Sequence, residues 1–115
     1  RVDFEGFKKD IIPYYLHARV TILTSLYEGY PNVLIESISM NTPVIAFDCP
    51  SGPNEIIIDG RNGYLVKNQN VEDLKKKMLN FPYENFVYKD LVNSIKKNHI
   101  QKVIKKYEDV IDSYI

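Results

Sequence analysis

The chain has 115 residues, 44% of them hydrophobic and 26% charged, a composition typical of one small globular domain with one core. Its 15 basic and 15 acidic residues give a formal net charge of zero, which argues against a strongly charged surface for nucleic acid. A single cysteine, Cys49, excludes an internal disulfide bond and fits a reducing compartment, and no apolar run approaches transmembrane length.

The first part of the chain predicts a strand, a helix and a second strand. Residues 2–4 alternate apolar and polar side chains and are followed by Gly6, so they predict a short strand with its turn. Residues 8–19 predict a helix that tolerates Pro13 only in its first turn. Residues 20–24 are rich in β-branched side chains, which predicts a strand buried on both faces.

The next segment predicts a helix and a strand joined by a short turn. The helix covers about residues 32–40, and Asn41 follows where a left-handed residue commonly ends a helix. Pro43 prevents the helix from continuing, and residues 44–47 form another continuous apolar strand. A helix, a short turn and a strand in this order indicate a parallel α/β crossover.

The middle of the chain predicts two helices and a strand. Gly52 and Pro53 predict the start of a short helix through residue 58, and the turn dipeptides at 59–60 and 62–63 lead into a strand at 64–66. A helix follows, capped by Asn70 and with Glu72 and Asp73 in its first turn. Its predicted buried stripe consists of Leu74, Met78 and Leu79.

The last part of the chain predicts two amphipathic helices. Residues 84–97 carry Val87, Leu91 and Ile95 at four-residue spacing, and residues 100–114 continue with a heptad-like apolar stripe. This stripe, which spans only two heptads, indicates either a packed amphipathic helix or a coiled coil. The lysines after residue 67 fit solvated helix faces, with contact to an anionic membrane or another domain as the alternative.

Residues 27–36 combine phosphate-binding backbone with two carboxylates. A strand, a glycine-containing loop and a helix N-terminus in this order hold phosphates in α/β proteins. Glu28 and Glu36 would repel a phosphate, but a carboxylate accepts two hydrogen bonds and can grip a vicinal diol. A diol, a phosphate and a second polyol together describe a nucleotide sugar.

Five blocks of sequence resemble retaining glycosyltransferases of the GT-B fold, of the family 4 type, also called glycosyl transferases group 1. They are VDFEG (2–6), TSLYEGYPNVLIE (24–36), TPVIA (42–46), NEII (54–57) and DGRNGYLV (59–66). The resemblance covers about residues 2–81. It implies an α/β fold, a truncated Rossmann-like domain with a mostly parallel sheet at 1–81 and a helical extension at 82–115 that packs on it.

The resemblance also implies roles for individual residues. Glu36 would bind the ribose hydroxyls of the donor, and Glu28 would lie near the donor sugar and its reacting carbon as the catalytic group. Ser51 and Gly52 would line the donor site, although a helix cap is their simplest role. Backbone N–H groups would hold the sugar and the diphosphate along Gly29, Tyr30, Pro31, Asn32, Val33 and Leu34.

The implied activity is sugar transfer from a nucleoside-diphosphate sugar to a glycan or lipid-linked acceptor in surface polysaccharide or lipopolysaccharide assembly. The resemblance implies a retaining hexosyltransferase that needs no cofactor and no metal and binds no nucleic acid. It also implies a cytoplasmic location, with a peripheral position at the inner face of the cell membrane. Neither His17 nor His99 has neighbours that indicate a metal site.

The chain departs from the family pattern in three ways. Asn41 replaces a usual glycine, and Ser37 and Ser39 replace usual alanines. Two strands, a basic pair and the acceptor domain that the family places earlier do not precede Arg1. We therefore expect the last two-thirds of a donor domain, inactive alone, in which strand 2–4 pairs abnormally beside strand 20–24 or the exposed sheet edge self-associates.

Two other classes of protein are alternatives. One is a non-catalytic nucleotide-binding or protein-interaction α/β module, which donor binding to wild type and to a Glu36 variant would distinguish from the enzyme. The other is a receiver-like module, which needs a cluster of acids at the strand ends. Asp3 and Asp48 make a poor cluster of this kind.

Overall fold

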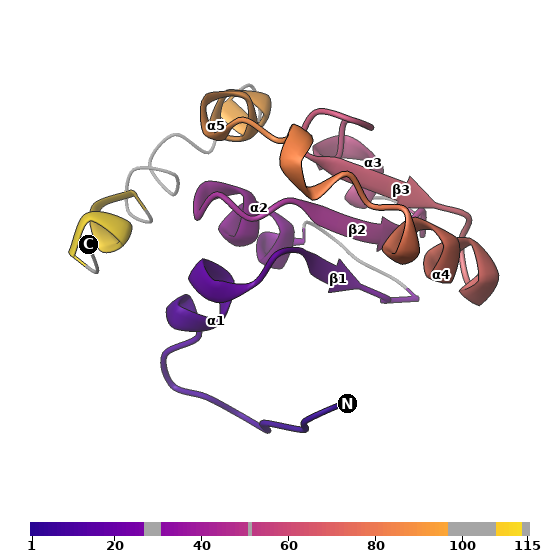
Figure 1. The fold of residues 1–115 in the computed structure, drawn as a ribbon, viewed down its shortest axis with the longest axis horizontal. Helices are drawn as coiled ribbons and strands as arrows, with labels where there is room; N and C mark the ends of the chain where they lie inside the picture. Colours follow the sequence, from indigo (N-terminus) through magenta and orange to yellow (C-terminus); the bar gives the residue numbers. More distant parts are fainter. Residues whose placement is uncertain (27–30, 51, 97–107, 114–115) are drawn as a thin grey trace.

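The computed structural model describes residues 1–26, 31–50, 52–96 and 108–113. Helices and strands alternate along most of the chain, and residues 108–113 are also helical (Figure 1). The elements are α1 (Ile12–His17), β1 (Thr21–Leu23), α2 (Asn32–Ser39), β2 (Val44–Phe47), α3 (Pro53–Ile56), β3 (Gly63–Val66), α4 (Val71–Leu79), a 3-10 turn (Tyr83–Asn85) and α5 (Tyr88–Lys96).

The three strands form one parallel sheet in the order β1-β2-β3. Thr21 pairs with Val44, and Val44 pairs with Gly63, so the strands start level with one another. Because all strands run the same way, the chain leaves the sheet at a single carboxyl edge and returns through the helices to the amino edge (Figure 1). The structure confirms the predicted parallel α/β class.

Helices cover both faces of the sheet, which explains why β2 is apolar at every position. On one face, α2, α3 and α5 pack against the sheet in a core cluster of Leu34, Ile35, Ile38, Val44, Ala46, Ile56, Ile57, Leu91, Val92 and Ile95. The opposite face packs against α4 and the segment after it through Ile45, Phe47, Val66 and Phe81, with Tyr64, Leu74 and Phe86 partly buried. Full burial of one such side chain contributes about 1.5–3 kcal/mol.

Helix α2 ends as its sequence predicts. Asn41 has a φ of +67°, the left-handed conformation that ends many helices. The Thr42 N–H donates to the Ser37 carbonyl at 2.9 Å, and the Asn41 N–H donates to the Ile38 carbonyl at 3.1 Å. These two bonds form a Schellman motif, which satisfies carbonyls at the helix end and turns the chain into β2.

The N-terminal prediction is wrong. Residues 1–10 form no strand and are exposed, with Phe4 at 96%, and they lead away from the sheet (Figure 1). Among the described residues β1 pairs only with β2, so the predicted pairing beside it does not occur. The first helix starts at Ile12, whose N–H donates to the Asp10 carboxylate at 3.1 Å. An apolar alternation of three residues without a neighbouring strand leaves its backbone hydrogen bonds to water.

Two of the predicted helical stripes are only partly correct. Of the stripe predicted for α4, only Leu74 is partly buried, whereas Met78 is exposed and Leu79 is 74% exposed. Phe81, just beyond the helix, takes the core position instead, and it stacks on Phe86 with ring centroids 5.2 Å apart.

Helix α5 starts at Tyr88, after the predicted first turn. It buries Leu91 and Ile95 as predicted but leaves Val87 exposed, because Val87 precedes the helix. Of the last predicted stripe, only Ile111 lies in the described residues, where it is buried against Tyr15 and Met40.

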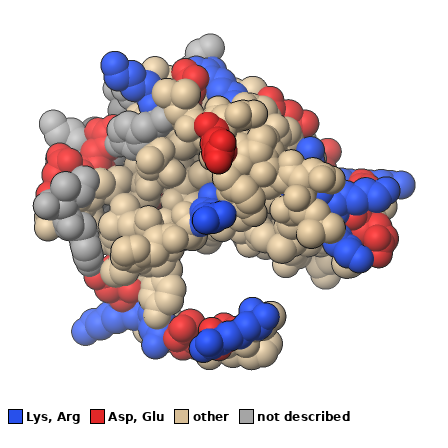
Figure 2. Space-filling view, viewed as in Figure 1, with Lys and Arg blue, Asp and Glu red and all other residues tan. Residues whose placement is uncertain are grey.

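The charged side chains on one face of the molecule are mixed in sign (Figure 2). Lysines and acids intermingle at the end of the molecule where α4 lies, and the Lys77 ammonium sits 4.0 Å from the centre of the Tyr64 ring. Across the described ranges, every helix falls short of the length and apolar character that crossing a membrane requires.

Candidate functional site

The residues predicted to bind the donor follow β1 and β2 at the carboxyl edge of the sheet. This edge is where open α/β sheets bind ligands. Glu28, Gly29, Tyr30 and Ser51 lie outside the described residues. Their assigned roles therefore stay predictions, and the described part of the site consists of the start of α2, Glu36 and Gly52.

The start of α2 offers backbone donors without a side-chain cap. Pro31 is the N-cap and is buried, and no described side chain accepts a hydrogen bond from the first-turn N–H groups of Asn32, Val33 and Leu34. The first turn also carries no acidic residue. By contrast, α4 is capped by Asn70, whose carbonyl accepts from the Asp73 N–H at 3.0 Å. In α2 the Leu34 N–H donates to the Pro31 carbonyl at 3.0 Å. The start of this helix therefore presents the N–H groups of Asn32 and Val33, and the positive end of a helix dipole, to an anion.

Glu36 lies four residues after Asn32, about 6 Å along the helix axis at 1.5 Å per residue. Its side chain is partly exposed. The Tyr15 hydroxyl donates a hydrogen bond to the Glu36 Oε2 atom at 3.2 Å. The sequence predicted Tyr15 only as part of the apolar face of its helix, because no spacing rule relates residues on two different helices.

Hydrogen bonds of two buried hydroxyl groups connect α2 to its neighbours next to Glu36. The Ser37 Oγ atom lies 2.7 Å from the Thr21 Oγ1 atom and 2.9 Å from the Thr42 carbonyl. The Thr42 hydroxyl donates to the Tyr15 carbonyl at 2.6 Å. Ser37 and Thr42 are buried, and their bonds join α1, β1, α2 and the turn before β2. Ser37, which replaces a usual alanine of the family, therefore adds a buried polar contact between α2 and β1.

Gly52 sits at the same edge, after β2. It is buried and is the N-cap of α3, with a φ of +91° that favours glycine, and Pro53 follows at the helix start. The predicted capping role is confirmed. Ile35 of α2 and Ile56 of α3 belong to the same core cluster, so the two helices that start at this edge pack together. The role of Gly52 in lining a donor site stays a prediction.

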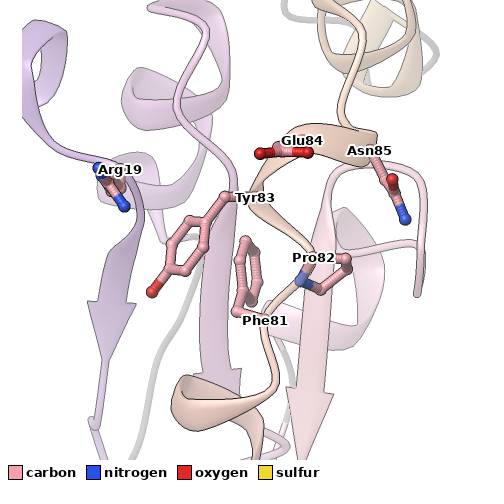
Figure 3. A pocket seen from close by; sticks show the side chains of 6 residues that line it. All are labelled: Arg19, Phe81, Pro82, Tyr83, Glu84 and Asn85. Atoms are coloured by element: carbon pink, nitrogen blue, oxygen red, sulfur yellow. The ribbon is translucent and has the colours of Figure 1, made fainter.

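A cavity of about 420 Å³ lies at the other edge of the sheet. It is lined by Arg19, Phe81, Pro82, Tyr83, Glu84 and Asn85, beside the tails of the strand arrows (Figure 3). The Arg19 guanidinium is 5.7 Å from the centre of the Tyr83 ring. This cavity holds one basic and one acidic side chain, and among its described lining residues only the 3-10 turn Tyr83–Asn85 starts there, so the carboxyl edge with the start of α2 fits a diphosphate better.

Within the described residues, no three histidine, cysteine, aspartate or glutamate side chains come together as a metal site would require. Cys49 is buried, in agreement with the expected inert thiol. Asp3 lies in the exposed N-terminal arm beside Arg1, with its Oδ2 atom 3.3 Å from the Arg1 Nε atom. Asp48 lies at the end of β2, so these two acids do not form a receiver-like pocket.

Comparison with known proteins decides the family. The model of the family described as "Glycosyl transferases group 1" matches residues 1–81. The chain belongs to the glycosyl transferases group 1 family. The match covers α1 to α4 and includes both the start of α2 and Glu36.

Relatives in this family are longer proteins. The chain is 30% identical over 100 residues to the poly(ribitol-phosphate) alpha-N-acetylglucosaminyltransferase of Staphylococcus aureus strain COL, covering 83% of the chain and 20% of that protein. It is 34% identical over 108 residues to the amylovoran biosynthesis glycosyltransferase AmsD of Erwinia amylovora, covering 90% and 30% respectively. The chain thus spans about a fifth to a third of the length of these group 1 relatives.

Solved structures share the fold. The apo form of the lipopolysaccharide outer core galactosyltransferase WaaB superimposes with a TM-score of 0.72 and 26% identity, covering the whole chain and 34% of WaaB. The crystal structure of TarM gives a TM-score of 0.72 and 28% identity, covering 93% of the chain and 22% of TarM. The α/β sheet with its flanking helices is therefore that of the GT-B glycosyltransferases.

Proposed function

We propose that this group 1 chain is the nucleotide-sugar-binding part of a glycosyltransferase. The complete enzyme transfers a sugar from a nucleoside-diphosphate sugar to a glycan or lipid-linked acceptor during surface polysaccharide or lipopolysaccharide assembly. The family match over residues 1–81 supports this proposal. Relatives named for amylovoran biosynthesis and for lipopolysaccharide galactosyl transfer support the kind of product.

The position of Glu36 carries the proposal. Its partly exposed carboxylate lies one helical turn behind the uncapped start of α2. Glu36 is about 6 Å along the helix axis from the helix start. This distance matches the separation between the ribose and the diphosphate of one nucleotide. The carboxylate then accepts hydrogen bonds from the ribose hydroxyls, while the N–H groups of Asn32 and Val33 hold the diphosphate.

The chemical roles follow from this placement and from the family resemblance. As the sugar departs, negative charge grows on the nucleoside diphosphate, and preorganised N–H donors stabilise it most where they point at the developing charge. We assign Glu28 to the donor sugar as an orienting and electrostatic group. Transfer retains configuration, with the acceptor attacking from the face that the diphosphate leaves, and uses no metal ion.

The acceptor is bound outside this chain in the proposed enzyme. The chain alone therefore binds donor without completing transfer. We further propose a hexosyl donor and a cytoplasmic enzyme that works at the inner face of the cell membrane, where lipid-linked acceptors lie. These assignments rest on the family resemblance.

Replacement of Glu36 tests the ribose contact. In the complete protein, Glu36→Gln keeps the size of the side chain but removes its charge, and we expect nucleoside-diphosphate affinity to fall by about 2 kcal/mol, or roughly 30-fold. Isothermal titration calorimetry with UDP, GDP, ADP and CDP measures it. Glu84→Gln is the matched control, because Glu84 lines the cavity at the opposite sheet edge. Unchanged affinity in Glu36→Gln would refute the assignment.

A further inference from the structure

We propose that Tyr15 is a positioning residue that orients the Glu36 carboxylate toward the ribose of the donor. This inference rests on the proposed function. Tyr15 lies on α1 and Glu36 on α2, 21 residues apart in sequence, yet the Tyr15 hydroxyl donates to the Glu36 Oε2 atom at 3.2 Å. Tyr15 is buried, with 8% of its surface exposed, whereas Glu36 remains partly exposed.

The Tyr15 ring is held from several sides. Met40 at the end of α2 and Ile111 pack against it, and its own carbonyl accepts from the Thr42 hydroxyl at 2.6 Å. Helix α1 has only six residues, too few to be stable without tertiary contacts. The position of the Tyr15 hydroxyl is thus set by α2 and by the turn that follows it, the same elements that place Glu36.

Ser37 strengthens this coupling next to Glu36 itself. The Ser37 Oγ atom lies 2.7 Å from the Thr21 Oγ1 atom and 2.9 Å from the Thr42 carbonyl. One buried hydroxyl group therefore ties α2 to β1 and to the residue that anchors Tyr15. A movement of α1 relative to α2 would break the bond from the Thr42 hydroxyl to the Tyr15 carbonyl, so this bond helps to keep the Tyr15 hydroxyl aligned with the Glu36 carboxylate.

A fixed carboxylate binds a diol better than a rotating one. Glu36 sits on a flexible side chain whose terminal torsion has broad preferences. A hydrogen bond from Tyr15 selects one orientation before the nucleotide arrives, which lowers the ordering cost of binding. A carboxylate has two oxygens and about four lone-pair sites, so one bond from tyrosine does not exhaust its capacity to accept ribose hydroxyls.

The test compares Tyr15→Phe with Tyr14→Phe in the complete protein. Tyr14 is the adjacent, exposed tyrosine of the same helix. The probes are the tightest-binding member of UDP, GDP, ADP and CDP and its 2′,3′-dideoxy counterpart, which lacks both hydroxyls. We expect Tyr15→Phe to weaken ribonucleotide binding about 3- to 10-fold, which corresponds to the cost of ordering one side chain on binding. Affinity for the dideoxy nucleotide, and both affinities of Tyr14→Phe, should be unchanged.

A second variant and a double variant separate positioning from folding. Thr42→Val removes the hydrogen bond from the Thr42 hydroxyl to the Tyr15 carbonyl and leaves the tyrosine ring unchanged, so it should also weaken binding of the ribonucleotide selectively. In a Glu36→Gln background, Tyr15→Phe should have no further effect on either nucleotide. Equal losses for both nucleotides, or a full extra loss in that background, would overturn the positioning role.

The outcomes also distinguish the two proposals. A wild-type protein that binds neither nucleotide, or binds both equally, contradicts the ribose contact itself and with it this inference. A wild-type protein that prefers the ribonucleotide through Glu36 but is unaffected by Tyr15→Phe contradicts the inference alone.

Discussion

Replacing Asn62 should destabilise the protein more than any change at an exposed asparagine. Asn62 is fully buried just before β3. Its amide nitrogen donates to the Ile56 carbonyl at 2.9 Å and to the Ser94 Oγ atom at 2.8 Å. Its amide oxygen accepts from the Ile58 N–H at 2.8 Å. One side chain thus ties α3, the segment after it and α5 to the start of β3.

The expected cost follows from the groups that lose a partner. In Asn62→Ala the Ile56 carbonyl and the Ile58 N–H lose the bond to the Asn62 amide, whereas the Ser94 hydroxyl still donates to the Leu91 carbonyl. A buried polar group left without a partner costs about 1–3 kcal/mol. We therefore expect the free energy of unfolding to fall by about 3 kcal/mol, which corresponds to roughly 10–20 °C in Tm for a domain of this size.

Urea unfolding followed by circular dichroism measures this change, with Asn93→Ala as the matched control. Asn93 is exposed on α5, beside Ser94 in sequence, and its replacement should stay within about 0.5 kcal/mol. Asn62→Asp keeps the acceptor but loses the donors, so it should not restore stability. If Asn62→Ala costs no more than Asn93→Ala, the three hydrogen bonds do not stabilise the fold as we infer.

Two further stability predictions use the same assay. Gly63→Ala places a methyl group 2.0 Å from the Val44 carbonyl oxygen, where β3 pairs with β2, and should cost about 3 kcal/mol, whereas Gly6→Ala in the exposed arm should change stability by about 1 kcal/mol or less. Equal effects at the two glycines would contradict the close strand contact. Leu91→Ala, at a fully buried position of α5, should cost about 2–5 kcal/mol. The exposed Val87 is its control, and a similar loss in Val87→Ala would contradict the assigned packing.

Features that depend on local chemistry could be predicted from the sequence. The bounds of β2 follow from four apolar residues between Pro43 and Asp48. Asn41 adopts its left-handed conformation because the helix must end before that proline. Asn70 caps α4 because its short side chain reaches the N–H of Asp73. In each case the signal lies within a few residues of the feature.

Features that depend on distant neighbours could not be predicted. Residues 2–4 have the pattern of a strand, but a strand forms only where a second strand lies beside it. Leu79 has the spacing of a core residue, but it is exposed at the end of α4, while Phe81 fills the core.

The candidate site shows the same division. The position of Glu36 one turn inside α2 could be predicted, because it stands at a fixed distance from the helix start within one continuous motif, whereas its contact with ribose stays a prediction. Its partner Tyr15 could not, because the contact depends on how α1 packs against α2. Glu28 stays a prediction from the motif and the family resemblance.

A structure of the complete protein with a bound nucleoside diphosphate would test the central claim most directly. We predict ribose hydroxyl oxygens within about 2.5–3.0 Å of the Glu36 carboxylate, and the diphosphate at the N–H groups of Asn32 and Val33. A nucleotide bound in the cavity beside Arg19 and Tyr83, or one whose ribose faces away from Glu36, would contradict the account.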